Sequence, residues 1–504
     1  MKKIFFLSAI VMGMAATSCD DYLDINVDPN SPSESVVTPG IVMPAAEMNF
    51  AATYGNLLRI PCGYHSQHFA QQFGTSNYVS YSQFEQSATR SSSIYTQNFR
   101  AIANFQTVID KSMASEEYAS VLAATCLRAM AFESMVDVYG AIPYSEALDP
   151  ANTAPAYEDG LTVYQGLIKE LDEAITLCKG ANNKVVCTNF LFPNGSYQNW
   201  ISFAQALKLR MLTRISGIAD TQAQIRQIID SEELPQEDIA YVSCWGNSSG
   251  NMNPYFSEEF SSNFGSTQIN VIANMALIAT MQQYDAEGNL EFQDGRLAKF
   301  FEPNGEGKYF GGLSGTNNST ASGFSTAKFC RPVASAQMPL SLISLCEIEF
   351  FKAEYWAKQK DAQKAAEAYE NAIRLSFSSC GADGADEVIA RYPMDINNWQ
   401  KVIGIAKWVA LAGIDDVEAY AEMRRLRYPA MGSVTGADIW DGASAYTMDK
   451  IVPGELYTPY QPYASVGTGK ILERWPFAES SSSRNSNCPK FANEDFTKKI
   501  FFAN

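Results

Sequence analysis

Runs of apolar residues at three- and four-residue spacing recur along this chain, and several come in pairs separated by only a short turn. Two helices joined by a turn of two or three residues pack antiparallel, so these pairs predict helical hairpins. Single runs of the same period indicate further helices. The paired runs occupy residues 342–358 with 361–376 and 399–412 with 415–427; the single runs occupy residues 94–112, 116–139, 161–178, 200–216 and 223–229.

The hairpin at residues 342–376 resembles a tetratricopeptide repeat. Ala353 lies on its first helix, and Ala365, Tyr369 and Ala372 follow on the second with the A-x3-[aromatic]-x2-A spacing of that repeat. Small alanines allow close helix approach, and the aromatic ring fills the adjoining groove. A generic helical hairpin remains the alternative on this one match. The predicted fold is mostly α, a tetratricopeptide-like helical hairpin array.

Two long stretches interrupt the helical pattern, at about residues 234–340 and 433–490. Both contain segments rich in Gly, Ser, Asn and aromatic residues. Ordinary connections have a median of about 4–6 residues, so these stretches are insertions rather than turns. Loops held on a rigid frame are where binding residues concentrate, and we expect the ligand-binding insertions here.

The N-terminus reads as an export and lipidation signal. Lys2 and Lys3 precede the apolar residues 4–16, and the small residues 16–18 come directly before Cys19. The apolar stretch is shorter than the roughly 20 residues that span a bilayer. We therefore expect a lipoprotein signal peptide at residues 1–18, a lipidated tether at 19–35 beginning with Cys19, and one helical-repeat domain at 36–504.

Charge and histidine content restrict the function. The net charge of −18 argues against a nucleic-acid partner, which requires clustered Lys and Arg. Only two histidines occur in 504 residues, which leaves little room for triad or metal-hydrolase chemistry. No phosphate-binding or nucleophile-elbow motif is present. We therefore predict that the chain is not an enzyme and needs no cofactor. A pair of carboxylates acting as in a glycosidase remains an alternative, because 55 acidic residues offer many pairs.

Metal-like patterns in the sequence are weak. His65 and His68 lie three residues apart with no third ligand in sight, and the Asp/Asn alternation at residues 24–30 is broken by a proline. The acidic cluster at residues 285–289 fits a polar turn better than a calcium loop. No metal is predicted. Cys178 and Cys187 flank a short polar loop, and the sequence leaves their pairing open.

Aromatic residues in the loop segments are the candidate ligand contacts. Flat rings stack on the C–H faces of sugars, while nearby amides and carboxylates hydrogen-bond to hydroxyls. Packing within loops would explain any single one of these rings equally well. The candidates are Tyr78, Tyr81, Trp245, Tyr255, Phe256 and Trp440.

Several segments together resemble the SusD/RagB outer-membrane nutrient-binding lipoproteins of Bacteroidetes, in particular the SusD-like branch. The most characteristic is LRAMAFESMVDVYGAIPYSEAL at residues 127–148, a helix followed by YGxIPYSEAL. NWISFAQALKLRMLTRIS at 199–216, DGRL at 294–297 and EIEFFKAEYW at 347–356 also fit the family pattern. In the closing segment ILERWPFAESSSSRN, Phe477 stands where Tyr is usual.

The resemblance implies a tetratricopeptide-like frame, a loop-rich ligand face and a partner, a SusC-like TonB-dependent barrel over which the lipoprotein closes. It implies an outer-membrane, lipid-anchored protein, and Asp20 and Asp21 after Cys19 resemble a surface-export signal, so we expect it to face the cell exterior. Glycans are the ligands of many members and peptides of others. We expect a non-catalytic protein that binds oligosaccharide and delivers it to the barrel; a peptide is the alternative, and a surface glycoside hydrolase a weaker one.

Overall fold

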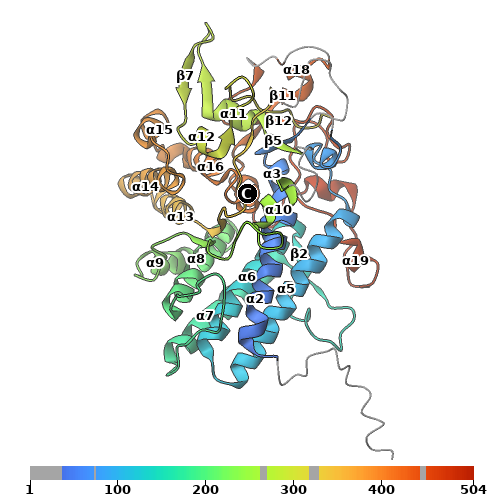
Figure 1. The fold of residues 1–504 in the computed structure, drawn as a ribbon, viewed down its shortest axis with the longest axis vertical. Coiled ribbons are helices and arrows are strands. Elements are labelled where there is room, and N and C mark those ends of the chain that lie inside the picture. Colours follow the sequence, from blue (N-terminus) through green and yellow to red (C-terminus); the bar gives the residue numbers. More distant parts are fainter. Residues whose placement is uncertain are drawn as a thin grey trace, which may run out of the picture.

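Helices carry most of the chain in the computed structural model, which describes residues 37–72, 75–261, 270–316, 328–442, 446 and 450–503 (Figure 1). The tether and signal peptide, with the Asp/Asn alternation at 24–30 and Cys19, lie outside these residues. Strands occur within the described part only as two-stranded pairs. The mostly-α prediction is confirmed.

A first group of helices packs side by side in the lower half of Figure 1. Each predicted run in this region forms a helix, and Gly140 ends α6 with a positive φ of 78°, as a helix-stop glycine does. The N-terminal helix α2 was not predicted, because its apolar residues show no clear one-sided period. The helices are α2 (Pro39–Ala52), α5 (Ala88–Ala114), α6 (Tyr118–Tyr139), α7 (Gly160–Gly180), α8 (Tyr197–Ile215) and α9 (Gln222–Ile229).

Helix α6 is the central helix of this group. It is long and apolar enough by composition to cross a membrane, but 94% of its most apolar window is buried inside the fold. Neighbouring helices α5, α7 and α8 surround it. It is a core helix, since its apolar surface is already covered by protein.

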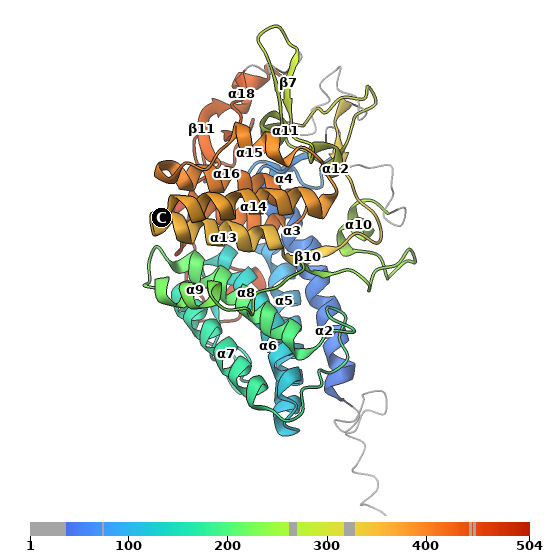
Figure 2. The same ribbon diagram turned by 90° about the vertical axis from the view of Figure 1, so that its left-hand side faces the viewer.

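A second group contains both predicted hairpins, and Figure 2 shows α13, α14 and α16 stacked across the middle of the molecule. Ala353, Ala365 and Ala372 are fully buried where α13 and α14 meet, and Tyr369 packs beside them, which agrees with the tetratricopeptide-like prediction. The helices are α13 (Leu345–Lys358), α14 (Ala362–Cys380), α15 (Ala385–Arg391), α16 (Trp399–Leu411) and α17 (Asp416–Leu426).

The first hairpin begins later than the sequence predicts. Residues 340–343 form strand β10 (Leu340–Ile343), which pairs antiparallel with β4 (Ile239–Tyr241). The helix starts after Ser344, whose hydroxyl caps it by accepting from the backbone N–H of Glu347. The local apolar period could not show this, because the strand partner lies about 100 residues away.

Buried ion pairs join the two helix groups. Arg210 and Arg214 of α8 face Glu347 of α13 and Glu418 of α17; Arg210 Nε lies 2.7 Å from Glu347 Oε1. Burial raises the pKa of Glu347, whereas the charges of Arg214 and Arg210 outweigh burial and lower that of Glu418. Such pairs fix how the groups dock, since separating them would leave buried charges without partners.

The two insertions fold into short strands and helices, some of which project at the top of Figure 2. The first contains β4, α10 (Pro254–Glu259), β5 (Val271–Ala273), α11 (Met275–Met281), β6 (Gln282–Tyr284), β7 (Leu290–Gln293), α12 (Leu297–Phe300), β8 (Phe301–Glu302), β9 (Arg331–Pro332) and β10. The second contains β11 (Ala430–Thr435), α18 (Gly436–Ile439), β12 (Glu455–Thr458) and α19 (Glu479–Ser482). Residues 285–289 form the predicted polar turn, in which Asn289 N–H donates to Asp285.

Four short elements after α2 bring the chain into contact with these insertions: η1 (Thr53–Leu58), α3 (Arg59–His65), β1 (Phe69–Gln71) and α4 (Val79–Ser82). His65 is the last residue of α3, so His65 and His68 do not share a helix. Burial lowers the pKa of His65 to about 3, and its ring packs among aromatic rings. His68 Nδ1 lies 2.7 Å from Asp416. Two further strands, β2 (Ala141–Pro143) and β3 (Tyr157–Asp159), pair beside α6 and α7.

The nine cysteines of the described residues are all free, Cys178 and Cys187 included. Cys126 and Cys346 are buried, as is usual for cysteines that behave as small apolar side chains.

Candidate ligand-binding site

Three of the six candidate aromatics meet in one cluster, and a fourth, Phe256, lies at its edge, although their segments lie about 175 residues apart. Tyr78 directly precedes α4, Tyr81 lies within α4, and Tyr255 lies on α10. Tyr64 of α3 is their common neighbour: its ring centroid lies 5.6 Å from that of Tyr78 and 6.4 Å from that of Tyr81. Phe69 lies 6.2 Å from Tyr64 and stacks on Tyr255 at 6.1 Å. We call this set the Tyr78–Tyr255 cluster.

Stacked ring pairs run through the cluster and its edge. Tyr78 and Tyr81 are stacked with an interplanar angle of 17°, and Phe256 stacks on Phe260 at 12°. Tyr81 is buried, whereas Tyr78, Phe256 and Phe260 are half-buried and present part of their rings outward. The cluster is therefore a packed base with three partly open rings.

Local sequence fixes the second half of the cluster. Asn253 caps α10 by accepting the backbone N–H of Tyr255 at 2.9 Å, and Pro254 occupies the first turn, where its missing N–H costs nothing. The Asn253 side-chain amide also donates to the Met338 carbonyl at 3.0 Å. One asparagine thus starts the helix and attaches it to the segment before β10.

Polar groups line the side of the cluster next to Tyr78. The Tyr78 hydroxyl donates to Glu259, and burial raises the pKa of Glu259. Within the described residues, the second oxygen of Glu259, the side-chain oxygen of Asn270 and both amide atoms of Gln72 are buried without a hydrogen-bond partner. Buried polar atoms are normally paired, so these atoms mark a place where a ligand or water completes the hydrogen bonding.

Arg59 closes the other side. Its guanidinium lies 4.1 Å from the Tyr255 ring centroid, and its Nε donates to Asp416 at 2.9 Å. Arg59 also lines a cavity of about 330 Å³ with Phe300, Phe301 and Met338. The cluster is thus bounded by a paired cation on one side and, on the other, by an acid and amides that keep buried polar atoms without a partner in the described residues.

The two tryptophans among the candidates lie elsewhere. Trp245 is 8% exposed, and its indole N–H donates to the Tyr241 carbonyl at 2.9 Å. Trp440 is 2% exposed and packs against Tyr460 and Tyr446. Both rings belong to the apolar core, so neither presents a face toward the Tyr78–Tyr255 cluster.

Sequence reasoning missed Tyr64, Phe69, Glu259 and Asn270. Tyr64 and Phe69 stand in GYHSQHF, a segment that was considered only for its histidines. Glu259 lies three residues after Phe256. Its position four residues after Tyr255 was the one available signal, since such residues share a helix face.

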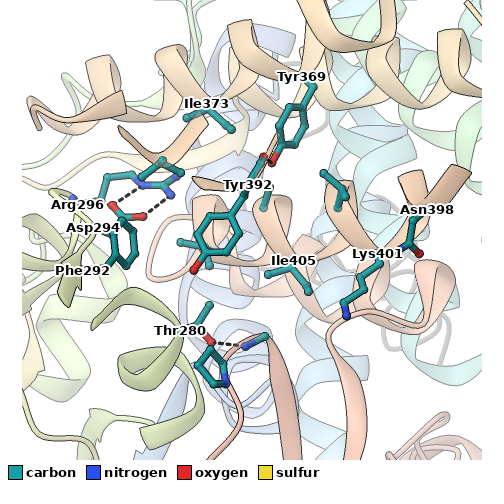
Figure 3. Close-up of a pocket in the computed structure, with 16 residues that line it drawn as sticks. Thr280, Phe292, Asp294, Arg296, Tyr369, Ile373, Tyr392, Asn398, Lys401 and Ile405 are labelled. Carbon is teal, nitrogen blue, oxygen red and sulfur yellow. Dashed lines mark hydrogen bonds and ion pairs between the residues drawn. The ribbon is translucent and has the colours of Figure 1, made fainter. Parts of the chain in front are cut away.

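An apolar pocket of about 320 Å³ lies beside the second helix group (Figure 3). Two of its polar lining groups are already engaged: Asp294 pairs with Arg296 at 2.7 Å, and the Thr280 hydroxyl accepts from the Gly454 N–H at 2.9 Å. Ile373, Ile405 and other aliphatic side chains supply most of the remaining wall. Phe292, Tyr369 and Tyr392 add aromatic rings to this largely apolar wall.

The fold is that of a helical-repeat protein, and the Tyr78–Tyr255 cluster lies on its short elements α3, β1, α4 and α10. The family model described as "starch-binding associating with outer membrane" matches residues 29–448. The chain belongs to this SusD-like family. No curated protein matches it in sequence.

Solved structures share this fold. A SusD homologue from Bacteroides uniformis is 21% identical, with a TM-score of 0.71 and coverage of 91% of this chain and 99% of that one. A chitin-binding protein is 18% identical, with a TM-score of 0.69 over 92% of this chain and all of that one. A chitin-binding SusD homologue from Flavobacterium johnsoniae is 18% identical, with a TM-score of 0.66 over 88% of this chain and 94% of that one.

Proposed function

We propose that this protein is a non-catalytic cell-surface lipoprotein that binds oligosaccharide at the Tyr78–Tyr255 cluster and delivers it to a SusC-like TonB-dependent barrel. One observation carries the choice of site: partly open aromatic rings adjoin a buried carboxylate oxygen and amide atoms that have no partner in the described residues. Sugars need this combination, because their C–H faces stack on rings and their hydroxyls donate and accept hydrogen bonds.

Membrane attachment in this proposal is through acylated Cys19, with the binding domain at residues 36–504 outside the cell. The family description associates the family with the outer membrane, and the signal-like residues 1–18 supply the export route. The net charge of −18 agrees with a neutral rather than anionic ligand.

Calorimetry of the purified protein against a panel of oligosaccharides and peptides tests this proposal. N-acetylchitohexaose is the first probe, because two of the similar structures are chitin-binding proteins. We expect heat with at least one neutral oligosaccharide, and we expect Tyr78→Ala to weaken it about tenfold, as loss of one ring contact does.

Trp245→Phe is the matched control, because it alters a candidate ring that lies away from the cluster. Heat with peptides alone would overturn the glycan proposal in favour of a peptide ligand. Release of reducing ends from a bound glycan would overturn the non-catalytic proposal. Equal affinities of Tyr78→Ala and the native chain would reject the site.

A further inference from the structure

A wide groove of about 690 Å³ lies in the first insertion, away from the Tyr78–Tyr255 cluster. One wall is the β6–β7 hairpin, whose strands pair antiparallel and which projects at the top of Figure 1. The opposite wall is the segment at residues 304–310. None of the residues lining the groove belongs to the Tyr78–Tyr255 cluster.

Three aromatic rings line this groove. Tyr284 is 53% exposed, which is unusual for a large ring that serves only packing, and Tyr309 and Phe310 are half-buried on the other wall. Phe310 stacks on Phe329 at 5.8 Å and on Tyr446 at 5.5 Å, so it is held rigidly from behind. Rings that are fixed at the back and open at the front lose little conformational freedom when a ligand binds.

Polar side chains surround these rings. Asp285, Glu291 and Glu306 supply carboxylates, and Lys308 and Lys328 supply ammonium groups. Glu306 pairs with Lys308, and Glu291 pairs with Arg391. Hydrogen bonds from Asn289 hold the pKa of Asp285 below its usual value, so this carboxylate is ionised at neutral pH. Because these charges nearly balance, the groove gives an anionic ligand no net attraction and suits a neutral ligand that carries hydroxyl groups.

The loop wall is held in shape by its own hydrogen bonds. The Asn304 side-chain oxygen accepts the backbone N–H groups of Glu306 and Lys308, both at 2.9 Å, and its amide donates to the Lys328 carbonyl at 2.8 Å. Tyr309 and Phe310 directly follow this turn, so their positions are set before any ligand arrives.

We infer that this groove is a second carbohydrate-binding site, one that takes a neutral oligosaccharide with its sugar faces against Tyr284 and Tyr309. The inference rests on the proposed glycan-binding function and adds a separate place of contact. Two sites on one protein allow a long chain to be held at two points, which raises its overall affinity when both can be engaged together.

Titration of the full-length lipoprotein in detergent with N-acetylchitohexaose, maltohexaose and hexagalacturonate tests the inference. We expect Tyr284→Ala to weaken binding of the neutral hexasaccharide by about five- to tenfold, as loss of a stacking ring does. Leu290→Ala is the control, because Leu290 is the cross-strand partner of Tyr284, is also 53% exposed and does not line the groove.

The outcomes separate the two proposals. Weaker binding in Tyr284→Ala with native binding in Leu290→Ala supports the groove. Binding that is weakened by Tyr78→Ala but not by Tyr284→Ala overturns the groove and leaves the Tyr78–Tyr255 cluster standing. Tighter binding of hexagalacturonate than of either neutral hexamer overturns the charge argument. Absence of binding by every glycan tried overturns both proposals.

Discussion

Arg425 of α17 and Glu354 of α13 form a two-point ion pair in the protein interior. Nη1 lies 2.7 Å from Oε1 and Nη2 lies 2.6 Å from Oε2, and neither side chain exceeds 2% exposure. Arg425 also pairs with Glu422. Although burial opposes ionisation, the charges of Arg425 and Lys358 lower the pKa of Glu354. Side-chain geometry of this kind ties the two predicted hairpins together.

Replacing Arg425 by Met tests that role. The change removes the Arg425 guanidinium from buried Glu354 and Glu422, which keep Lys358 and Lys407 as their main cationic partners. Loss of one partner from a buried pair costs about 3–5 kcal/mol. Urea unfolding followed by circular dichroism measures it. Arg374→Met is the control, because Arg374 is 49% exposed and pairs only at the surface, and it should cost less than about 1 kcal/mol. Equal losses in the two variants would contradict the structural role of the buried pair.

Glu47 of α2 gives a pH dependence. Its carboxylate accepts the backbone N–H of Phe190 at 2.7 Å and of Leu191 at 3.1 Å, and burial raises its pKa to about 7. Because the folded pKa exceeds the ordinary value of 4.5, the folded state binds the proton more tightly than the unfolded state. The stabilisation from this proton is fully present below pH 4.5 and is lost as the pH rises through about 7; its size is about 3 kcal/mol.

Glu47→Gln removes this titration. The neutral amide still accepts one of the two N–H groups, so we expect a smaller loss of stability between pH 5 and pH 8 than in the native chain. Urea midpoints at the two pH values measure the difference. A variant that loses as much stability as the native chain over this range would show that Glu47 is not the group responsible.

We expect a substitution of Glu259 to lower the affinity for ligand more than it lowers the free energy of unfolding. Its carboxylate accepts from Tyr78 and keeps one buried oxygen unpaired within the described residues. Glu259→Gln keeps the shape but removes a charged acceptor, and hydrogen bonds to charged groups contribute about 1.5–3 kcal/mol, so affinity for the bound glycan should fall at least tenfold. Calorimetry of Glu258→Gln supplies the control, because this neighbouring acid is exposed. Equal losses of affinity in Glu259→Gln and Glu258→Gln would mean that the net negative charge of this region, and not the Glu259 contact, determines binding.

The helical frame could be predicted well from the sequence, because each helix produces an apolar period among neighbouring residues. The hairpins at α13–α14 and α16–α17 have apolar stripes, short turns and caps within a few residues of one another. The pairing of β10 with β4 and the buried positions of Arg210 and Arg214 depend on partners more than 70 residues away. An arginine in an apolar run looks like a surface residue until its carboxylates are known.

The candidate site was predictable only in part for the same reason. Aromatic loop composition pointed to Tyr78, Tyr81 and Tyr255, but a list of rings does not say which of them meet. Tyr64 contacts Tyr78, and Phe69 stacks on Tyr255, so these two rings connect the candidates. Phe69 is itself positioned by the pairing of β1 with β5. Trp245 and Trp440 had the same local signal and lie in the core.

Gly295 in the DGRL turn has no room for a side chain. A Cβ at this position would lie 2.0 Å from the backbone oxygen of Asp383, and a backbone atom cannot move aside as a side chain can. Gly295→Ala should therefore displace the turn that holds the Asp294–Arg296 ion pair against α14, at a cost of about 2–3 kcal/mol.

Gly180→Ala is the matched substitution, because nothing lies within 4 Å of a Cβ at this last residue of α7. Alanine lowers the entropy of the unfolded chain and favours helix, so this variant should unfold at an equal or slightly higher urea concentration, with a gain of up to about 1 kcal/mol. Urea unfolding of the two variants beside the native chain gives the comparison. A Gly295→Ala protein as stable as Gly180→Ala would mean that residues 294–296 and 383 can separate at little cost, contrary to the close approach seen here.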